Sequence, residues 1–122
     1  MCGIVGYVGK RDAKNILIEG LLKLEYRGYD SAGFAVLNKN NELEFLKSKG
    51  RVKNLVNDEE FNNVLGNLGI AHTRWATHGE PSTINSHPHL DVEGKIAVVE
   101  QNHKKLKNGQ KKTLLKRSFL YY

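Results

Sequence analysis

The residue with the most evident chemistry is a cysteine at the second position of the chain. Cys2 is the only cysteine among 122 residues, and only Met1 precedes it. Removal of Met1 would give Cys2 both a thiol and a free α-amine. The thiolate is the nucleophile, and an amine with a pKa of about 7.7–8.0 can act as its general base. We therefore treat Cys2 as a candidate catalytic nucleophile, with a permissive chain end as the alternative.

A second group of reactive side chains lies between positions 72 and 89. This stretch holds four of the five histidines and directly follows an apolar run at 68–72. Polar residues at the end of a strand commonly form a site on the loop that follows. An arginine there can bind a carboxylate through two hydrogen bonds. The candidate ligand-binding residues of this loop are Arg74, Thr77, His78 and Gly79.

Simpler interpretations of several of these residues stay open. Trp75 is a large apolar side chain that could belong to the core. Arg27 and Asp30 could form an ordinary surface ion pair. Zinc is a further alternative for the histidines, but their spacing fits no zinc-finger pattern and a second cysteine is absent from the sequence. We therefore expect no metal and no cofactor.

Composition is typical of one soluble domain of about this length. Hydrophobic residues make up 39% of the sequence and charged residues 26%. A single cysteine fits a reducing compartment, and neither a secretory signal nor an apolar run of about 20 residues is visible. We expect a cytoplasmic protein that does not span a membrane.

The positive charge is confined to the end of the sequence. The whole chain carries a formal charge of +6, but residues 101–122 contain seven Lys or Arg and no acid. Residues 1–100 contain 12 basic and 13 acidic residues, so this part is almost neutral. A basic tail can bind polyanions, which makes a small nucleic-acid-binding protein an alternative that we do not favour.

Hydrophobic periodicity predicts alternating strands and helices that would position these residues. Leucines at i, i+4 and i+7 favour a helix over 13–24, and Asp58 is a candidate cap for a short helix over 59–65. Residues 38–41 (NKNN) predict a hairpin turn. From residue 100 onward neither period is clear, and we expect an irregular or partly helical tail. The predicted strands are 4–8, 34–37, 43–46, 68–72 and 96–99.

Three motifs in this order carry a resemblance to a known family. They are CGIVGYVG at 2–9, LLKLEYRGYDSAG at 21–33 and HTRWATHGEPSTINSHPH at 72–89. Residues 2–99 resemble the glutaminase domain of the glutamine–fructose-6-phosphate aminotransferases, also called glucosamine-6-phosphate synthases. The first motif alone indicates only the wider group of N-terminal-nucleophile (class II) glutamine amidotransferases, and the other two narrow the assignment.

The resemblance implies an α+β fold, a four-layer αββα sandwich of the N-terminal-nucleophile hydrolase type, present here in part. It implies that Cys2 attacks the side-chain amide of glutamine, releases ammonia, and forms a thioester that water hydrolyses to glutamate. In the family, a separate isomerase domain uses the ammonia to convert fructose 6-phosphate into glucosamine 6-phosphate, and the protein is a dimer. The implied roles are glutamine binding for Arg74, Thr77 and His78, and support of the site for Arg27, Trp75 and Gly79.

The resemblance ends at the strand predicted over 96–99. The family continues with an Asn-Gly pair that forms the oxyanion hole, whereas this chain reads Glu100, Gln101, Asn102 and His103. We therefore expect a partial glutaminase domain at 1–99 and a divergent basic tail at 100–122, as in a truncated copy with impaired activity. A non-catalytic remnant that binds glutamine or a partner chain is the alternative.

Overall fold

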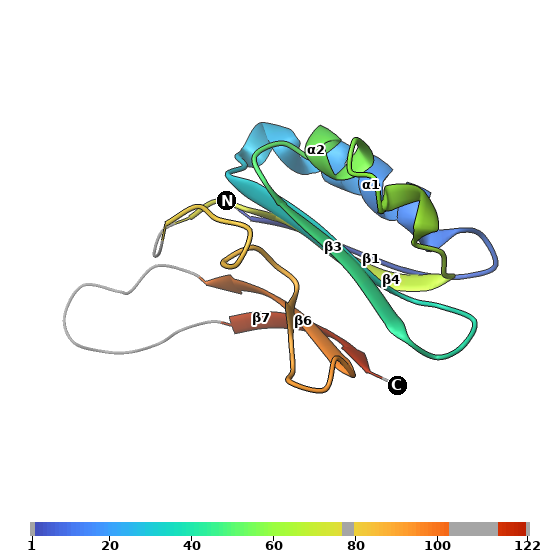
Figure 1. Cartoon of the computed structure of the whole chain (residues 1–122). Helices are drawn as coiled ribbons and strands as arrows, with labels where there is room; N and C mark the ends of the chain where they lie inside the picture. Colours follow the sequence, from blue (N-terminus) through green and yellow to red (C-terminus); the bar gives the residue numbers. More distant parts are fainter. Residues whose placement is uncertain (1, 77–79, 103–114, 122) are drawn as a thin grey trace.

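The computed structural model describes residues 2–76, 80–102 and 115–121, which form three layers (Figure 1). The first layer is helical, the second is a four-stranded sheet in the order β1-β4-β2-β3, and the third is a three-stranded sheet in the order β5-β6-β7. All strand pairs are antiparallel. The strands are β1 (Gly3–Val8), β2 (Ser31–Leu37), β3 (Leu43–Lys49), β4 (Leu68–Arg74), β5 (His89–Leu90), β6 (Ile96–Asn102) and β7 (Leu115–Tyr121).

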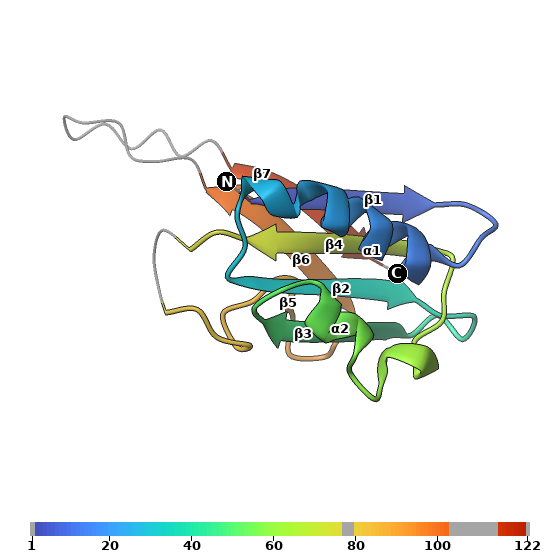
Figure 2. The ribbon, with the colours of Figure 1, turned by 90° about the horizontal axis from the view of Figure 1, so that it is seen from above.

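The helices lie over one face of the four-stranded sheet, and the second sheet lies under the other (Figure 2). The α-helices are α1 (Ala13–Leu24) and α2 (Lys53–Val56), and the 3-10 helices are η1 (Glu25–Arg27) and η2 (Phe61–Asn63). These layers are the helix–sheet–sheet part of the predicted αββα sandwich. No helix within the described ranges is long and apolar enough to cross a membrane.

Helix α1 has the bounds that the sequence predicts. The Asp12 side chain caps it by accepting a hydrogen bond from the Lys14 N–H at 3.2 Å. Leu17 and Leu21, one turn apart, are fully buried against the sheet. The chain then tightens into η1 and leaves it at Gly28, whose φ of 114° favours glycine.

The four-stranded sheet is buried on both faces because its strands alternate between two cores. Phe34 and Val36 of β2 pack toward the helices, in the larger core. Ala35, between them, packs with Ile70 in a second core together with Ala97 and Val99 from the other sheet. This period of two is what joins the three layers.

One predicted helix is wrong. Residues 59–65 form only the short 3-10 helix η2, and the sequence gave no sign of α2. The Asp58 side chain does accept a hydrogen bond from the Glu60 N–H at 2.9 Å. Val64, however, is already extended, and the Leu65 N–H donates to the Glu44 side chain on β3 at 3.3 Å. This tertiary hydrogen bond ends the helix.

The prediction of an irregular or helical tail is also wrong. Strand β6 continues through residue 100 as far as Asn102, and β7 pairs with it in antiparallel register. Glu100 lies opposite Arg117 in that register, an arrangement that favours pairing. A β6 strand without β7 would leave one row of backbone groups unpaired, so tertiary pairing decides the structure here. The division of the chain at 99 and 100 stays a prediction.

Candidate active site

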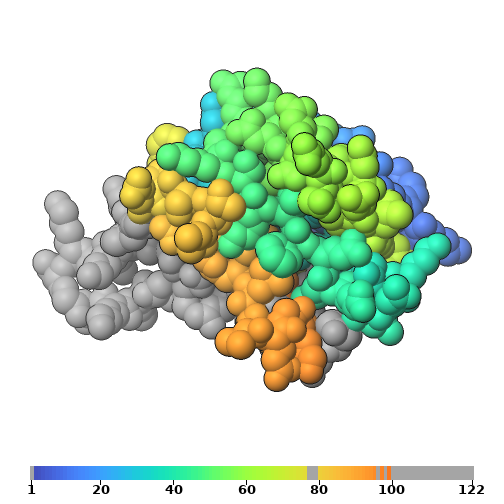
Figure 3. Space-filling model, viewed as in Figure 1, coloured from blue at the N-terminus to red at the C-terminus, as the bar shows by residue number. Residues whose placement is uncertain are grey.

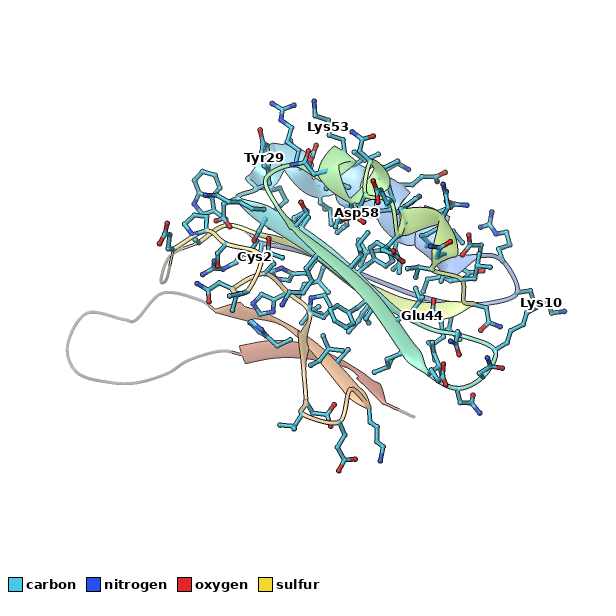
Figure 4. All side chains as sticks on the ribbon, viewed as in Figure 1. Cys2, Lys10, Tyr29, Glu44, Lys53 and Asp58 are labelled. Carbon is cyan, nitrogen blue, oxygen red and sulfur yellow. The ribbon has the colours of Figure 1, made fainter. Side chains whose placement is uncertain are left out.

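The strand register brings three segments together at one end of the first sheet. Gly3 is opposite Thr73, and Ser31 is opposite Arg74. Cys2 therefore lies beside the end of β4, and Asp30 lies beside it on the other side. Figure 4 shows Cys2 at this end of the sheet. Residues that are about 30 and 70 positions apart in the sequence thus share one site because the sheet is antiparallel.

The thiol of Cys2 is held by the backbone of Trp75. The Trp75 N–H lies 3.4 Å from the Cys2 Sγ, and the thiol lies 3.8 Å from the Trp75 carbonyl, which it can approach as a weak donor. The Gly3 N–H donates to the Thr73 hydroxyl at 3.2 Å. A Cβ on Gly3 would lie 2.7 Å from that hydroxyl oxygen, so glycine is required for this close approach. Cys2 itself is only partly buried, and its sulfur remains accessible to a substrate.

The Trp75 ring packs on Gly28. A Cβ on Gly28 would lie 2.9 Å from the ring atom Cδ2, which only a residue without a side chain permits. The ring is 52% exposed, so it is not part of the core. Arg27, which precedes this glycine in η1, is brought to the same end of the sheet. These contacts place the two predicted supporting residues, Arg27 and Trp75, around the Cys2 end of the sheet.

Arg74 ends β4 with its guanidinium held in place. Its side chain is 11% exposed, and Nη1 lies 4.0 Å from the Asp30 Oδ1. The same nitrogen donates to the Glu80 carbonyl at 3.5 Å. A fixed guanidinium next to a thiol can orient a substrate that carries a carboxylate.

Asp30 is the residue of this site that the sequence interpretation missed. It is not a surface residue, since its side chain is 15% exposed and forms an ion pair with Arg74. Its Oδ1 accepts from the Ser31 hydroxyl at 3.1 Å, and its Oδ2 accepts from the Ala76 N–H. The Asp30 N–H donates to the Arg74 carbonyl at 2.8 Å. Its position directly before the six buried residues of β2 was the available signal.

The histidines stack instead of converging on one point. The rings of His72 and His87 are 4.3 Å apart between centroids, and so are those of His87 and His89. His72 is fully buried, whereas His89 is exposed. Within the part of the chain that the structure describes, no group of three or more His, Cys, Asp or Glu residues could hold a metal ion.

Three of the predicted site residues lie outside the described part of the chain. Thr77, His78 and Gly79 fall between Ala76 and Glu80, the described residues on either side. Their predicted contacts with substrate therefore stay predictions. The site that the structure describes consists of Cys2, Arg74, Trp75 and Asp30, with Arg27 and Gly28 beside them.

Comparison with known proteins adds a family to this geometry. No protein-family model matches the chain. A glutamine–fructose-6-phosphate aminotransferase (isomerizing) of Clostridium acetobutylicum is 61% identical over 99 residues, which are 81% of this chain and 16% of that protein. The enzyme of the same name from Cyanidium caldarium is 54% identical over 115 residues, covering 88% of this chain and 18% of that protein. The chain thus spans about a sixth of the length of these relatives.

Solved structures give the same fold. A glutamine phosphoribosylpyrophosphate amidotransferase from B. subtilis, complexed with ADP and GMP, matches 84% of this chain with a TM-score of 0.69 at 24% identity, over 22% of its own length. An allosteric regulatory enzyme of purine biosynthesis matches the same share of both chains with a TM-score of 0.72 at 26% identity. The fold is therefore that of the N-terminal-nucleophile amidotransferases. Together with the sequence identities, it shows that this chain belongs to the glutamine–fructose-6-phosphate aminotransferase family.

Proposed function

We propose that this chain hydrolyses glutamine to glutamate and ammonia, with Cys2 as the nucleophile. The observation that carries the proposal is the position of the Cys2 thiol, 3.4 Å from the Trp75 N–H at the sheet end where Arg74 is held. A nucleophile and a carboxylate-binding cation are the two groups that an α-amino acid amide requires. The family membership supports the same reaction.

The proposed reaction has two stages. The α-amine of Cys2, free once Met1 is removed, takes the thiol proton, and the sulfur attacks the amide carbon of the glutamine side chain. The proton passes to the leaving nitrogen, the C–N bond breaks, and ammonia leaves a thioester behind. Water then adds to the thioester carbon, the C–S bond breaks, and glutamate and the thiol are restored.

The other residues bind and enclose the substrate. Arg74 holds the α-carboxylate of glutamine, and Thr77 and His78 complete the pocket for it. Trp75, half exposed beside Gly28, covers the exit for ammonia, with Arg27 and Gly79 in support. These roles follow the family resemblance, and the positions of Arg74 and Trp75 around Cys2 support them.

The synthesis of an amino sugar lies beyond this chain. The relatives are about six times longer, and we propose that the remainder of such a protein uses the ammonia to convert fructose 6-phosphate into glucosamine 6-phosphate. A cytoplasmic location and a dimer are part of the same proposal.

The rate of hydrolysis should be low. The transition state carries an oxyanion, and removal of one oxyanion donor typically lowers a rate by about 10²–10³. The sequence after Val99 is Glu100, Gln101, Asn102, without the Asn-Gly pair of the family at that spacing. Strand β6 ends at Asn102, at the end of the molecule where Cys2 lies (Figures 1 and 2).

Release of glutamate by the purified chain tests this proposal. The wild-type chain should release glutamate from glutamine, and Cys2→Ala should abolish the release because no other group supplies the nucleophile. Arg74→Ala should raise KM by about tenfold or more through loss of a charged hydrogen bond to the carboxylate. Glutamate release that persists in Cys2→Ala, or that is absent from the wild-type chain, contradicts the proposal. Glutamine binding without release indicates the non-catalytic alternative.

A further inference from the structure

A groove lies at the end of the first sheet that is opposite Cys2. It is bounded by the loop between β1 and α1, by the turn between β2 and β3, and by residues 63–67, and it encloses about 500 Å³. Figure 4 shows Lys10 and Glu44 at this end and Cys2 at the other. In Figure 3 the loop and the turn form the right-hand end of the molecule. The volume is within the range of about 300–1,000 Å³ typical of small-molecule sites.

Three cations at the rim of this groove have no acidic partner. Lys10, Arg11 and Lys39 line the groove and are exposed. The ion pairs of the described residues are Arg74 with Asp30 and Lys95 with Glu93, and neither pair includes a cation of the groove. Three positive charges from two separate loops therefore face one hollow.

The two acids of the groove are already engaged. Asp12 uses one oxygen for the Lys14 N–H and the other for the Asn15 side chain, at 3.2 and 3.3 Å. Glu44 accepts from the Asn38 side chain at 2.9 Å and from the Leu65 N–H at 3.3 Å. Each carboxylate thus has both oxygens satisfied by the fold, and neither is placed to neutralise the rim cations.

Two amides complete the lining. Asn40 and Asn67 line the groove and are exposed, and neither side-chain amide makes a hydrogen bond with another described residue. A carboxamide both donates and accepts, as a hydroxyl does, so it is suited to a polyhydroxyl compound. Cations with amides in one hollow match a ligand that has an anionic end and a hydroxylated body.

We propose that this groove binds a phosphorylated sugar, with the phosphate held by Lys10, Arg11 and Lys39 and the sugar hydroxyls by Asn40 and Asn67. The cations converge on a hollow of bounded volume and do not form a stripe along a helix or strand, which favours a small anion over a nucleic acid. The groove is separate from Cys2, so this proposal is independent of glutamine hydrolysis.

Calorimetric titration of the full chain with glucose 6-phosphate tests the proposal, with glucose and inorganic phosphate as comparison probes. We expect one saturable site for glucose 6-phosphate and weaker binding of both comparison probes. Lys39→Gln and Arg11→Gln should each weaken the binding about tenfold, as loss of a charged hydrogen bond does. Lys53→Gln removes the same charge from an exposed position on α2, away from the groove, and should leave the binding unchanged.

Several results would overturn the proposal. They are the absence of saturable binding at millimolar glucose 6-phosphate, equal weakening by Lys53→Gln, and equal affinity for glucose 6-phosphate and inorganic phosphate. Tighter binding of a DNA oligonucleotide that competes for the same cations would also overturn it, in favour of a polyanion surface. Asn67→Ala provides a second variant with unchanged charge and should weaken glucose 6-phosphate without affecting inorganic phosphate.

Discussion

The carboxylate of Asp30 connects three segments around Cys2. It pairs with the Arg74 guanidinium, accepts from the Ala76 N–H and accepts from the Ser31 hydroxyl. Because Trp75 lies between the two residues that Asp30 holds, the same carboxylate fixes the backbone that contacts the Cys2 thiol. Asp30 is therefore a positioning residue for the site.

Substitution of Asp30 tests this role. Asp30→Ala should lower the free energy of unfolding by about 1–3 kcal/mol, because it leaves buried polar groups without their partner. It should lower kcat/KM for glutamine by about tenfold to a hundredfold through displacement of Arg74 and Trp75. Asp30→Asn, which retains one acceptor oxygen, should have the smaller effect in urea denaturation.

Asp58 provides the matched control for Asp30. Its carboxylate also accepts a backbone N–H, at 2.9 Å, but it is exposed and remote from Cys2. Asp58→Ala should leave kcat/KM unchanged. Equal loss of activity in the Asp30 and Asp58 variants would rule out a specific role for Asp30.

Gly28 supports a second prediction at the residue scale. Its φ of 114° and its contact with the Trp75 ring both exclude a side chain. Gly28→Ala should lower the free energy of unfolding by about 1–3 kcal/mol through backbone strain and shift the fluorescence of Trp75, the only tryptophan. Gly94 also has a positive φ, of 68°, but a Cβ there would meet nothing within 4 Å. Gly94→Ala should therefore show strain without a fluorescence shift; a shift in both variants, or in neither, contradicts the contact.

The site residues illustrate what the sequence could predict at this scale. Cys2 and Arg74 were identified because their chemistry is specific and their position is at a chain end or a strand end. Asp30 was missed because its importance depends on the register of β2 against β4, which pairs Ser31 with Arg74. Local pattern contains no information on which distant residue an acid will contact.

At the scale of elements, a buried lysine joins α1 to η2. Lys14 is 5% exposed, its Nζ donates to the Phe61 carbonyl at 2.9 Å, and the ammonium lies 4.5 Å from the centre of the Phe61 ring. The cation is thus paired with a carbonyl and an aromatic face instead of with an acid. This contact anchors the segment that follows α2 onto the first helix.

Lys14→Met should lower the free energy of unfolding by about 1–3 kcal/mol, since the methionine retains the apolar stem but leaves the Phe61 carbonyl unpaired. Lys23→Met, an exposed change on the same helix, should alter it by less than about 0.5 kcal/mol. Urea denaturation measures both values. Equal stability of the two variants would show that the Lys14 contact contributes nothing.

Elements with local signals were predicted well, and those that depend on tertiary pairing were not. Helix α1 has a cap and an apolar face, and its predicted bounds are confirmed. The five predicted strands are present, although β2, β3, β4 and β6 extend beyond the predicted runs into polar residues. Strand β7 was missed because its pairing with β6, and not its own pattern, makes it a strand.

At the scale of the whole molecule, the three layers place the two ends of the first sheet far apart in function. One end holds Cys2, Arg74 and Asp30, where the strands β1, β4 and β2 meet. The other end holds the groove of Lys10 and Lys39. The antiparallel register is what separates reactive residues from binding residues along the same strands.

The measurement that most directly tests the account is intact-mass spectrometry of the chain after brief mixing with glutamine and an acid quench. The account predicts a chain without Met1, part of which has gained the mass of one glutamyl group, and no such gain in Cys2→Ala. This adduct is the thioester that the Cys2 mechanism requires. A retained Met1, or release of glutamate without an adduct and with equal rate in Cys2→Ala, would contradict the claim that Cys2 is the nucleophile.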